Sequence, residues 1–246
     1  MISDPIEFEL FKNALFGIAD EMALTVFRTT YSGVLKDNMD YSTALFDGDG
    51  VLVAQGLTLP GHLGSMPTAI AAVQAAFAGQ IHAGDVFILN DPFQGGMHLP
   101  DVFIFEPIFR PGLDETPIAW ACAVCHQTDV GGRVPGSNAS DSTEIYQEGL
   151  RIPPLKLFDR GTRNNTLWAL IERNVRVPVK VFGDLRAQLA ACHISERSLI
   201  ELAGHLRGRE GRALHDGADR LLRAHDARRD PRIARWSLHF SRPYRR

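Results

Sequence analysis

Two H-x-x-D segments combine residue types that can bind a metal ion. They are His98–Asp101 (H-L-P-D) and His126–Asp129 (H-Q-T-D), and each lies where a turn meets a predicted strand. Imidazole nitrogen and carboxylate oxygen together suit Mn²⁺, Fe²⁺ or Zn²⁺, and three protein ligands leave positions open for water or substrate. The same spacing also occurs in ordinary histidines that hydrogen-bond a nearby carboxylate. The residues alone therefore leave both interpretations open.

Glycine pairs flank both segments, and a histidine stands in a third glycine-rich turn, G-H-L-G-S. Glycine lets the backbone turn sharply and approach a ligand closely. The G-H-L-G-S turn lacks the serine position of a G-x-S-x-G nucleophile loop, so we expect it to shape a pocket. The predicted substrate-binding residues are Gly95, Gly96, Gly131, Gly132 and His62.

Other motifs point away from zinc-ribbon and nucleotide-binding proteins. Cys122 and Cys125 precede His126, but no second cysteine pair exists, and positions 122 and 125 of a strand face opposite sides. Together with Cys192 they are an odd, small set typical of free thiols in a reducing compartment. The sequence has no G-x-x-x-x-G-K-[ST] loop, so any nucleotide must bind at an unrecognised site or on another chain.

Hydrophobic periodicity predicts an α+β fold with a mixed, strand-rich sheet core flanked by helices. Apolar residues three and four apart indicate a helix over 5–30, and further helices fit 67–78 and 184–206, with Asp184 as the N-cap of the last. The hairpin strands 43–46 and 51–54 and the buried strands 86–89, 102–109 and 118–124 should form the sheet. The loop 131–141 is long enough to be functional.

Composition favours a cytoplasmic globular protein without a membrane segment. The 246 residues are 45% hydrophobic, and no apolar run or N-terminal signal stands out. Residues 207–246 contain twelve arginines, no lysine and five acidic residues. Because aromatic residues are few and no periodicity accompanies the charge, we expect a solvated or poorly ordered tail and no nucleic-acid partner. The predicted division is therefore 1–206 and 207–246.

Six segments in order resemble the hydantoinase B/oxoprolinase family. The family includes N-methylhydantoinase B subunits, the C-terminal half of 5-oxoprolinase and a related acetone carboxylase subunit. The segments are D-N-M-D-Y-S-T-A-L-F-D, G-H-L-G-S-M-P, N-D-P-F-Q-G-G-M-H-L-P-D, H-Q-T-D-V-G-G, E-G-L-R-I-P-P and G-D-L-R-A-Q-L-A-A. They extend over about residues 5–206, which makes the resemblance specific although each segment alone is weak.

The resemblance implies a subunit of an ATP-dependent hydrolase that opens a cyclic amide of the hydantoin or 5-oxoproline type. ATP would bind a hydantoinase A-type partner in a hetero-oligomer. In the carboxylase branch, two histidines and an aspartate hold manganese, and they correspond to His98, Asp101 and His126 here. Asp129, in the same motif as His126, is the predicted catalytic residue, which we expect to orient a ligating imidazole or to accept a proton. Zinc or iron are alternatives to manganese.

Two other functions remain open from the sequence. One is a subunit of an ATP-dependent ketone carboxylase, whose substrate would be a ketone. The other is an inactive fragment or a remnant that only binds a partner. Family B subunits are considerably longer, and the resemblance fades after about Leu206, so we expect a truncated or frame-shifted reading over residues 207–246.

Overall fold

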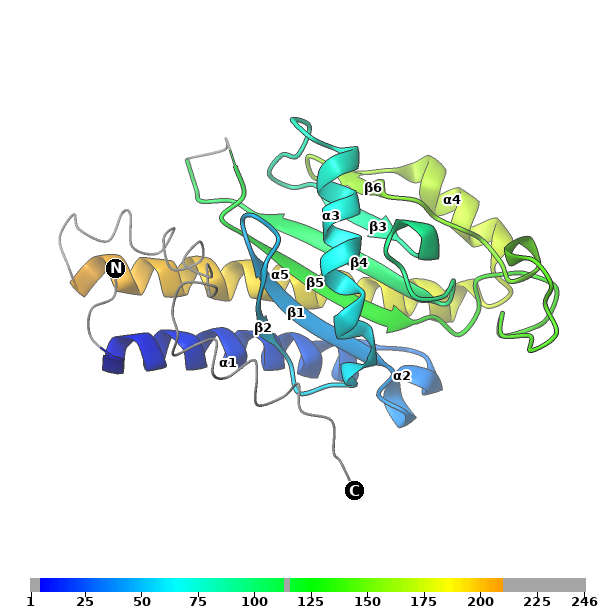
Figure 1. Cartoon of the computed structure of the whole chain (residues 1–246), viewed down its shortest axis with the longest axis horizontal. Helices are drawn as coiled ribbons and strands as arrows, with labels where there is room; N and C mark the ends of the chain where they lie inside the picture. The colour runs from blue at the N-terminus through cyan, green and yellow to red at the C-terminus, as the bar shows by residue number, and fades with distance from the viewer. Residues whose placement is uncertain (1–4, 113–115, 210–246) are drawn as a thin grey trace, which may run out of the picture.

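A seven-stranded antiparallel sheet forms the centre of the described chain, which comprises residues 5–112 and 116–209 in this computed structural model (Figure 1). The strand order is β2-β1-β5-β4-β3-β6-β7. The strands are β1 (Tyr41–Asp47), β2 (Leu52–Gln55), β3 (Val86–Leu89), β4 (Asp101–Ile108), β5 (Ala119–His126), β6 (Leu155–Asp159) and β7 (Thr162–Arg163). This architecture confirms the predicted α+β class.

The predicted strands are confirmed with small shifts at their ends. The hairpin of β1 and β2, strand β3 and the long pair β4 and β5 all form where hydrophobic runs predict them. Strands β6 and β7 were not predicted. The sequence of β6, L-K-L-F-D, follows a pair of prolines and is too short to show a clear alternation of apolar and polar residues. β6 pairs with the free edge of β3, and β7 pairs in turn with β6.

Helices cover both faces of the sheet. α1 (Pro5–Thr29) and α5 (Pro178–Arg209) pack on one face, and α3 (Met66–Ala76) crosses the other (Figure 1). Each face has its own hydrophobic cluster, because alternate residues of a strand point to opposite sides. α4 (Asn165–Asn174) adds three buried side chains to the α1 and α5 side, whereas the short α2 (Gly33–Asp37) links α1 to β1.

The last helix begins earlier than the sequence predicts. α5 begins at Pro178, so Asp184 lies inside it and the prediction of Asp184 as its N-cap is wrong. Its Oδ1 atom instead accepts hydrogen bonds from the Thr30 hydroxyl and from the backbone N–H groups of Tyr31 (2.7 Å) and Ser32 (3.1 Å). A Cβ on Gly183 would lie 2.3 Å from the Tyr31 ring. The Gly183–Asp184 pair therefore fixes the junction between α1 and α2 against α5.

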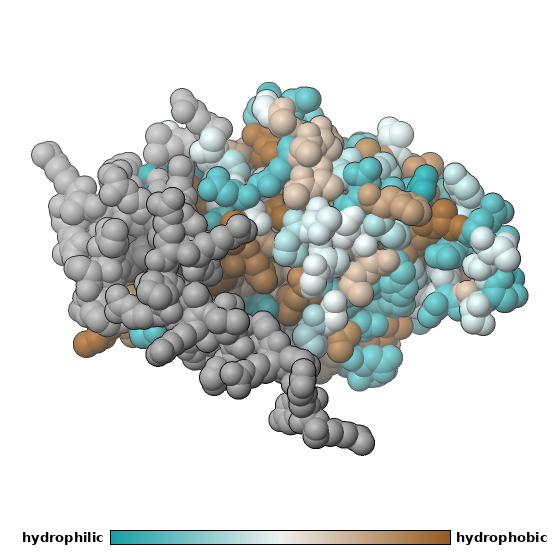
Figure 2. Space-filling view, viewed as in Figure 1, coloured by the Kyte–Doolittle hydropathy of each residue, from teal (hydrophilic) through white to brown (hydrophobic). Residues whose placement is uncertain are grey.

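The surface visible in Figure 2 mixes hydrophilic and hydrophobic residues over the α3 face. Within the described ranges, none of the helices has the length and hydropathy needed to cross a membrane. Most of the arginine-rich segment predicted as a tail, residues 210–246, lies outside the described residues.

Replacing Asp184 with alanine should destabilise the fold by about 2–4 kcal/mol. Asp184 is fully buried, and its loss leaves two backbone N–H groups and a hydroxyl without their acceptor. Urea unfolding of the variant beside the wild type measures this loss. Glu172→Ala, at an exposed position of α4, is the control and should stay within about 0.5 kcal/mol of the wild type. Equal stability of the two variants would contradict the assigned role of Asp184.

Candidate metal centre

Strand register brings the predicted ligands together at one end of the sheet. Asp101, the first residue of β4, pairs directly with His126, the last residue of β5. On the other side of β5, the His126 N–H donates to the carbonyl of Asp40, which precedes β1. Because residues two apart share a face, Asp40, Asp101 and His126 all point to the α3 side of the sheet, opposite the neighbouring Cys125. Residues far apart in sequence thus meet at three adjacent strand ends.

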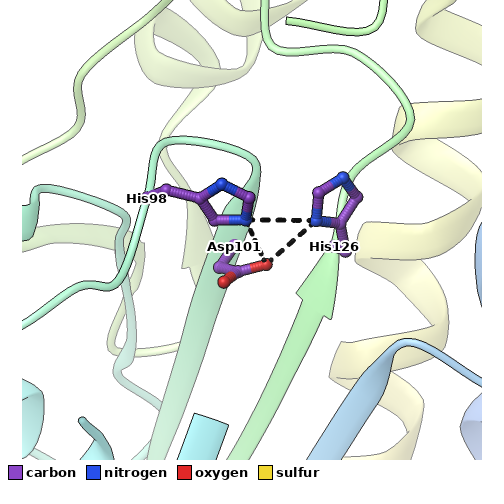
Figure 3. Close-up of side chains that lie close together, drawn as sticks. All are labelled: His98, Asp101 and His126. Atoms are coloured by element: carbon purple, nitrogen blue, oxygen red, sulfur yellow. Dashed lines mark hydrogen bonds and ion pairs between the residues drawn. The ribbon is translucent and has the colours of Figure 1, made fainter. Parts of the chain in front are cut away.

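His98 completes the cluster from the turn before β4. The Asp101 N–H donates to the His98 carbonyl (3.0 Å), and this turn places the imidazole beside the aspartate. His98 Nε2 lies 3.1 Å from Asp101 Oδ1 and 3.2 Å from His126 Nδ1, which itself lies 3.2 Å from the same oxygen (Figure 3). The structure therefore brings all three predicted ligands into one triangle of donor atoms.

This triangle fits a shared cation. Hydrogen bonds can satisfy at most two of its three sides, because each ring nitrogen carries at most one hydrogen and the carboxylate only accepts. Donors bonded to one ion at about 2.1 Å lie about 3.0–3.4 Å apart at right or tetrahedral angles. The observed separations fall in that span, and the two-histidine, one-carboxylate set is one that Mn²⁺, Fe²⁺ and Zn²⁺ accept.

Asp101 is the buried centre of the cluster, with a side chain only 2% exposed. Burial alone would raise the pKa of its carboxyl, but hydrogen bonds with His126, His62 and His98 hold that pKa well below its usual range. The hydrogen bond with Asp101 in turn raises the pKa of His98, against the opposing effect of burial. Asp101 is therefore ionised at neutral pH, and its negative charge can stabilise either an imidazolium or a metal ion beside it.

Two further residues face the same place. His62 lies in η1 (Pro60–Gly64), and its Nε2 is 3.5 Å from Asp101 Oδ1 and 3.6 Å from Asp40 Oδ1. Asp40 Oδ2 is 3.7 Å from His126 Nδ1. The Ser42 hydroxyl lies 2.9 Å from His62 Nδ1 and donates to the Leu59 carbonyl, which fixes the imidazole. The sequence predicts His62 as a pocket residue, whereas Asp40 was missed although it stands in the motif D-N-M-D-Y-S.

Asp129 lies apart from the triangle. Its carboxylate accepts four hydrogen bonds: Oδ1 from the N–H groups of Gly131 (3.0 Å) and Arg176 (2.9 Å), and Oδ2 from the N–H of Gly136 (3.1 Å) and from Arg176 Nη1 (2.9 Å). Both oxygens are thereby engaged by the glycine-rich loop and by the segment before α5. The structure thus gives Asp129 contacts that order this loop.

The four glycines predicted to contact substrate pack against the chain's own backbone. Gly95, Gly131 and Gly132 have φ angles of +94°, +94° and +79°, which favour glycine. A Cβ at any of the four, Gly96 included, would come within 2.6 Å of a backbone atom. Those atoms belong to Ala69, Asn90, Asn174 and Glu148. These glycines therefore allow the two loops to lie close to the backbone of α3, of the end of α4 and of neighbouring loops.

Buried amide side chains hold the loops and strands that carry the candidate ligands. The Asn90 amide donates to the carbonyls of Leu99 (2.6 Å) and Leu150 (2.9 Å), and its oxygen accepts from the Ile152 N–H (2.6 Å). Gln188 of α5 donates to main-chain carbonyls of both β4 and β5, each at 2.8 Å. Polar residues inside apolar runs were the available sequence signal for both, and their partners are visible only in the fold.

The three cysteines are buried free thiols, as the sequence predicts. Cys125 packs in the cluster on the α1 and α5 side of the sheet, and Cys122 packs in the cluster on the α3 side. Burial raises the pKa of each thiol well above its usual value. They therefore offer no thiolate to the candidate metal centre.

Comparison with known proteins places this chain in a family. The profile of the hydantoinase B/oxoprolinase family matches residues 4–237. The chain belongs to the hydantoinase B/oxoprolinase family. The match confirms the resemblance seen in the sequence motifs and continues past Leu206 into the arginine-rich segment.

Individual relatives support this assignment. The beta subunit of caprolactamase from Pseudomonas jessenii is 40% identical over 225 residues, which are 90% of this chain and 38% of that protein. A putative D-/L-hydantoinase B subunit of Pseudomonas sp. (strain NS671) is 31% identical over 204 residues, 81% of this chain and 34% of its own. The chain thus spans little more than a third of the length of these two relatives.

Two solved structures share the fold. The crystal structure of ATP-dependent caprolactamase from Pseudomonas jessenii has a TM-score of 0.79 and 37% identity, and the match covers 93% of this chain and 38% of that chain. A nucleotide-free acetone carboxylase structure has a TM-score of 0.75 at 24% identity, over 87% of this chain and 27% of that chain. The second likeness concerns the fold alone.

The Asp129 clamp should make stability depend on acid pH. Burial acts to raise the pKa of Asp129, but hydrogen bonds from Arg176, Gly136 and Gly131 lower it overall. A carboxyl whose pKa is lower in the folded state stabilises the fold fully above its unfolded pKa of about 3.9, and this stabilisation is lost as pH falls further. Asp129→Asn should therefore cost about 1–3 kcal/mol at pH 7.

Urea unfolding at pH 7 and at pH 3 tests the clamp, with Asp49→Asn in the exposed β1–β2 turn as the control. The difference between wild type and Asp129→Asn should shrink at pH 3, whereas the control should match the wild type at both values. A difference that stays constant between pH 7 and pH 3 would show that the carboxylate charge does not contribute.

Proposed function

We propose that this chain supplies the metal-binding part of the B-type subunit of an ATP-dependent hydrolase that opens a cyclic amide of the hydantoin or 5-oxoproline type. The observation that carries the proposal is the triangle of His98 Nε2, Asp101 Oδ1 and His126 Nδ1 at mutual distances of 3.1–3.2 Å. Membership of the hydantoinase B/oxoprolinase family supports the reaction class.

His98, Asp101 and His126 would hold a divalent ion, with manganese as the first choice and zinc or iron as alternatives. When bound, such an ion supplies a Lewis acid for a carbonyl or phosphorylated imidate oxygen and favours ionisation of water. Asp101 contributes the negative charge that the site needs, and its 2% exposure shields this charge from solvent.

The exposed edge of the cluster sets the direction from which a substrate would approach. The His98 side chain is 41% exposed, whereas His62 at 4% and Asp101 at 2% form the floor. The Asp40 carboxylate, at 29%, lies at the side and is placed to accept a hydrogen bond from a ring N–H or a water molecule. His62 Nε2 lies between the carboxylates of Asp101 and Asp40 and contacts both of them.

Asp129 and the four glycines support the site from a distance in this proposal. Asp129 orders the loop after His126 through Arg176. The glycine pairs allow the two ligand-bearing loops to pack on neighbouring backbone. In this proposal, Asp40 has the supporting role beside the ligands that we expected for Asp129 from the sequence.

ATP would bind a separate hydantoinase A-type subunit. This chain has no phosphate-binding loop motif, and one of its relatives is described as an ATP-dependent enzyme. Two relatives are named as beta or B subunits, which supports a hetero-oligomer. The proposed assembly belongs in the cytoplasm, where buried free thiols such as Cys122 remain reduced.

The His98→Ala variant should lose one equivalent of bound metal. Removing one of three ligands leaves two donors, so the affinity should fall at least tenfold. Elemental analysis after dialysis against limiting Mn²⁺ measures the content of wild type, His98→Ala and Asp101→Asn. His82→Ala is the matched control, because His82 lies outside the cluster. Unchanged metal content in both ligand variants would overturn the assignment.

Activity should require the chain, an A-type partner and ATP together. The co-expressed pair should open hydantoin, 5-oxoproline or caprolactam with release of ADP, and His98→Ala should lower this rate by at least a hundredfold. Product formation followed by chromatography measures ring opening directly. Consumption of acetone and bicarbonate in place of cyclic amides would instead establish the ketone carboxylase alternative.

A further inference from the structure

A buried glutamate lies on the opposite face of the sheet from the metal centre. Glu106 is the sixth residue of β4, on the same face as Val102, Ile104 and Ile108, which pack toward α1 and α5. Glu106 is 8% exposed. Among the described residues, its ion-pair contact is between Oε1 and His193 Nδ1 at 3.8 Å, beyond hydrogen-bonding distance.

This environment is costly for a carboxylate. A buried charge is normally paired or hydrogen-bonded, because burial removes its hydration. Burial, with a smaller effect of the nearby Glu196, raises the pKa of Glu106 to about 8. The group therefore needs either a proton or a cation at neutral pH.

α5 presents two further donor atoms to Glu106. His193 and Glu196 are three residues apart and share one face of the helix, with His193 Nδ1 3.4 Å from Glu196 Oε2. The donor atoms of Glu106, His193 and Glu196 all lie within 4.8 Å of one another. Donors bonded to one ion at about 2.1 Å are separated by about 3.0 Å at right angles and about 4.2 Å when opposite. The two separations from His193 Nδ1, 3.8 Å and 3.4 Å, fall within that range.

We propose that Glu106, His193 and Glu196 form a second divalent cation site that joins β4 to α5. Two carboxylates and one imidazole suit Mn²⁺, Fe²⁺ or Zn²⁺. The His193 side chain is 68% exposed, so an ion can enter from solvent, while Glu106 forms the buried end of the site. Five strand residues, about 17 Å, and opposite sheet faces separate Glu106 from Asp101. The site is therefore independent of the first centre.

Binding to the full-length chain in a His98→Ala background isolates the second site. Chelator-treated protein is titrated with Mn²⁺ and with Zn²⁺ by calorimetry. We expect His98→Ala to bind one equivalent of ion, and the His98→Ala/Glu106→Gln double variant to bind at least tenfold more weakly. Glutamine keeps the shape of the buried side chain and removes its charge, so the fold should be retained.

Two more variants control for folding and for non-specific binding. The second ligand test uses His98→Ala/His193→Gln, in which an exposed residue is changed and the same loss is expected. His98→Ala/Glu172→Gln alters an exposed glutamate of α4 and should bind like His98→Ala. The proposal is overturned if His98→Ala binds no ion, or if neither ligand variant differs from it. If the first centre is the incorrect assignment, His98→Ala will instead bind as the wild type does.

Discussion

The pairing of β4 with β5 is the constraint on which the candidate metal centre depends. This register places Asp101 opposite His126, and the neighbouring pairing of β5 with β1 brings in Asp40. A shift by one residue would turn every side chain of a strand to the other face and would separate Asp101 and His98 from His126. The candidate ligands therefore converge because of backbone hydrogen bonds of the sheet and of the turn before β4.

Polar side chains buried beneath the site secure this register. Gln188 binds carbonyls of both β4 and β5, so α5 cannot slide along the sheet without breaking two hydrogen bonds. Asp184, one helical turn earlier, ties α5 to the α1–α2 junction that leads to Asp40. Asn90 holds the turn that carries His98. Helix and loop anchors thus converge on the same three strand ends.

The two faces of β4 carry carboxylates in opposite electrostatic surroundings. Asp101 is surrounded by imidazoles, which lower its pKa. Glu106 has no such close donor among the described residues, and burial raises its pKa to about 8. Both are nearly inaccessible to solvent. The contrast shows that the partners of a buried acid, more than its burial, decide whether it is charged at neutral pH.

Local patterns in the sequence predicted the helices α1, α3 and α5, the main strands and the three candidate ligands His98, Asp101 and His126, because periodicity and the family motifs are properties of short segments. Only tertiary structure decided the contacts made between segments. Asp40 and His62 join the cluster through strand pairing and a turn. Asp129 instead accepts a hydrogen bond from Arg176, which lies 47 residues away in the sequence. The spacing of residues along the chain does not predict which distant donor will contact a carboxylate.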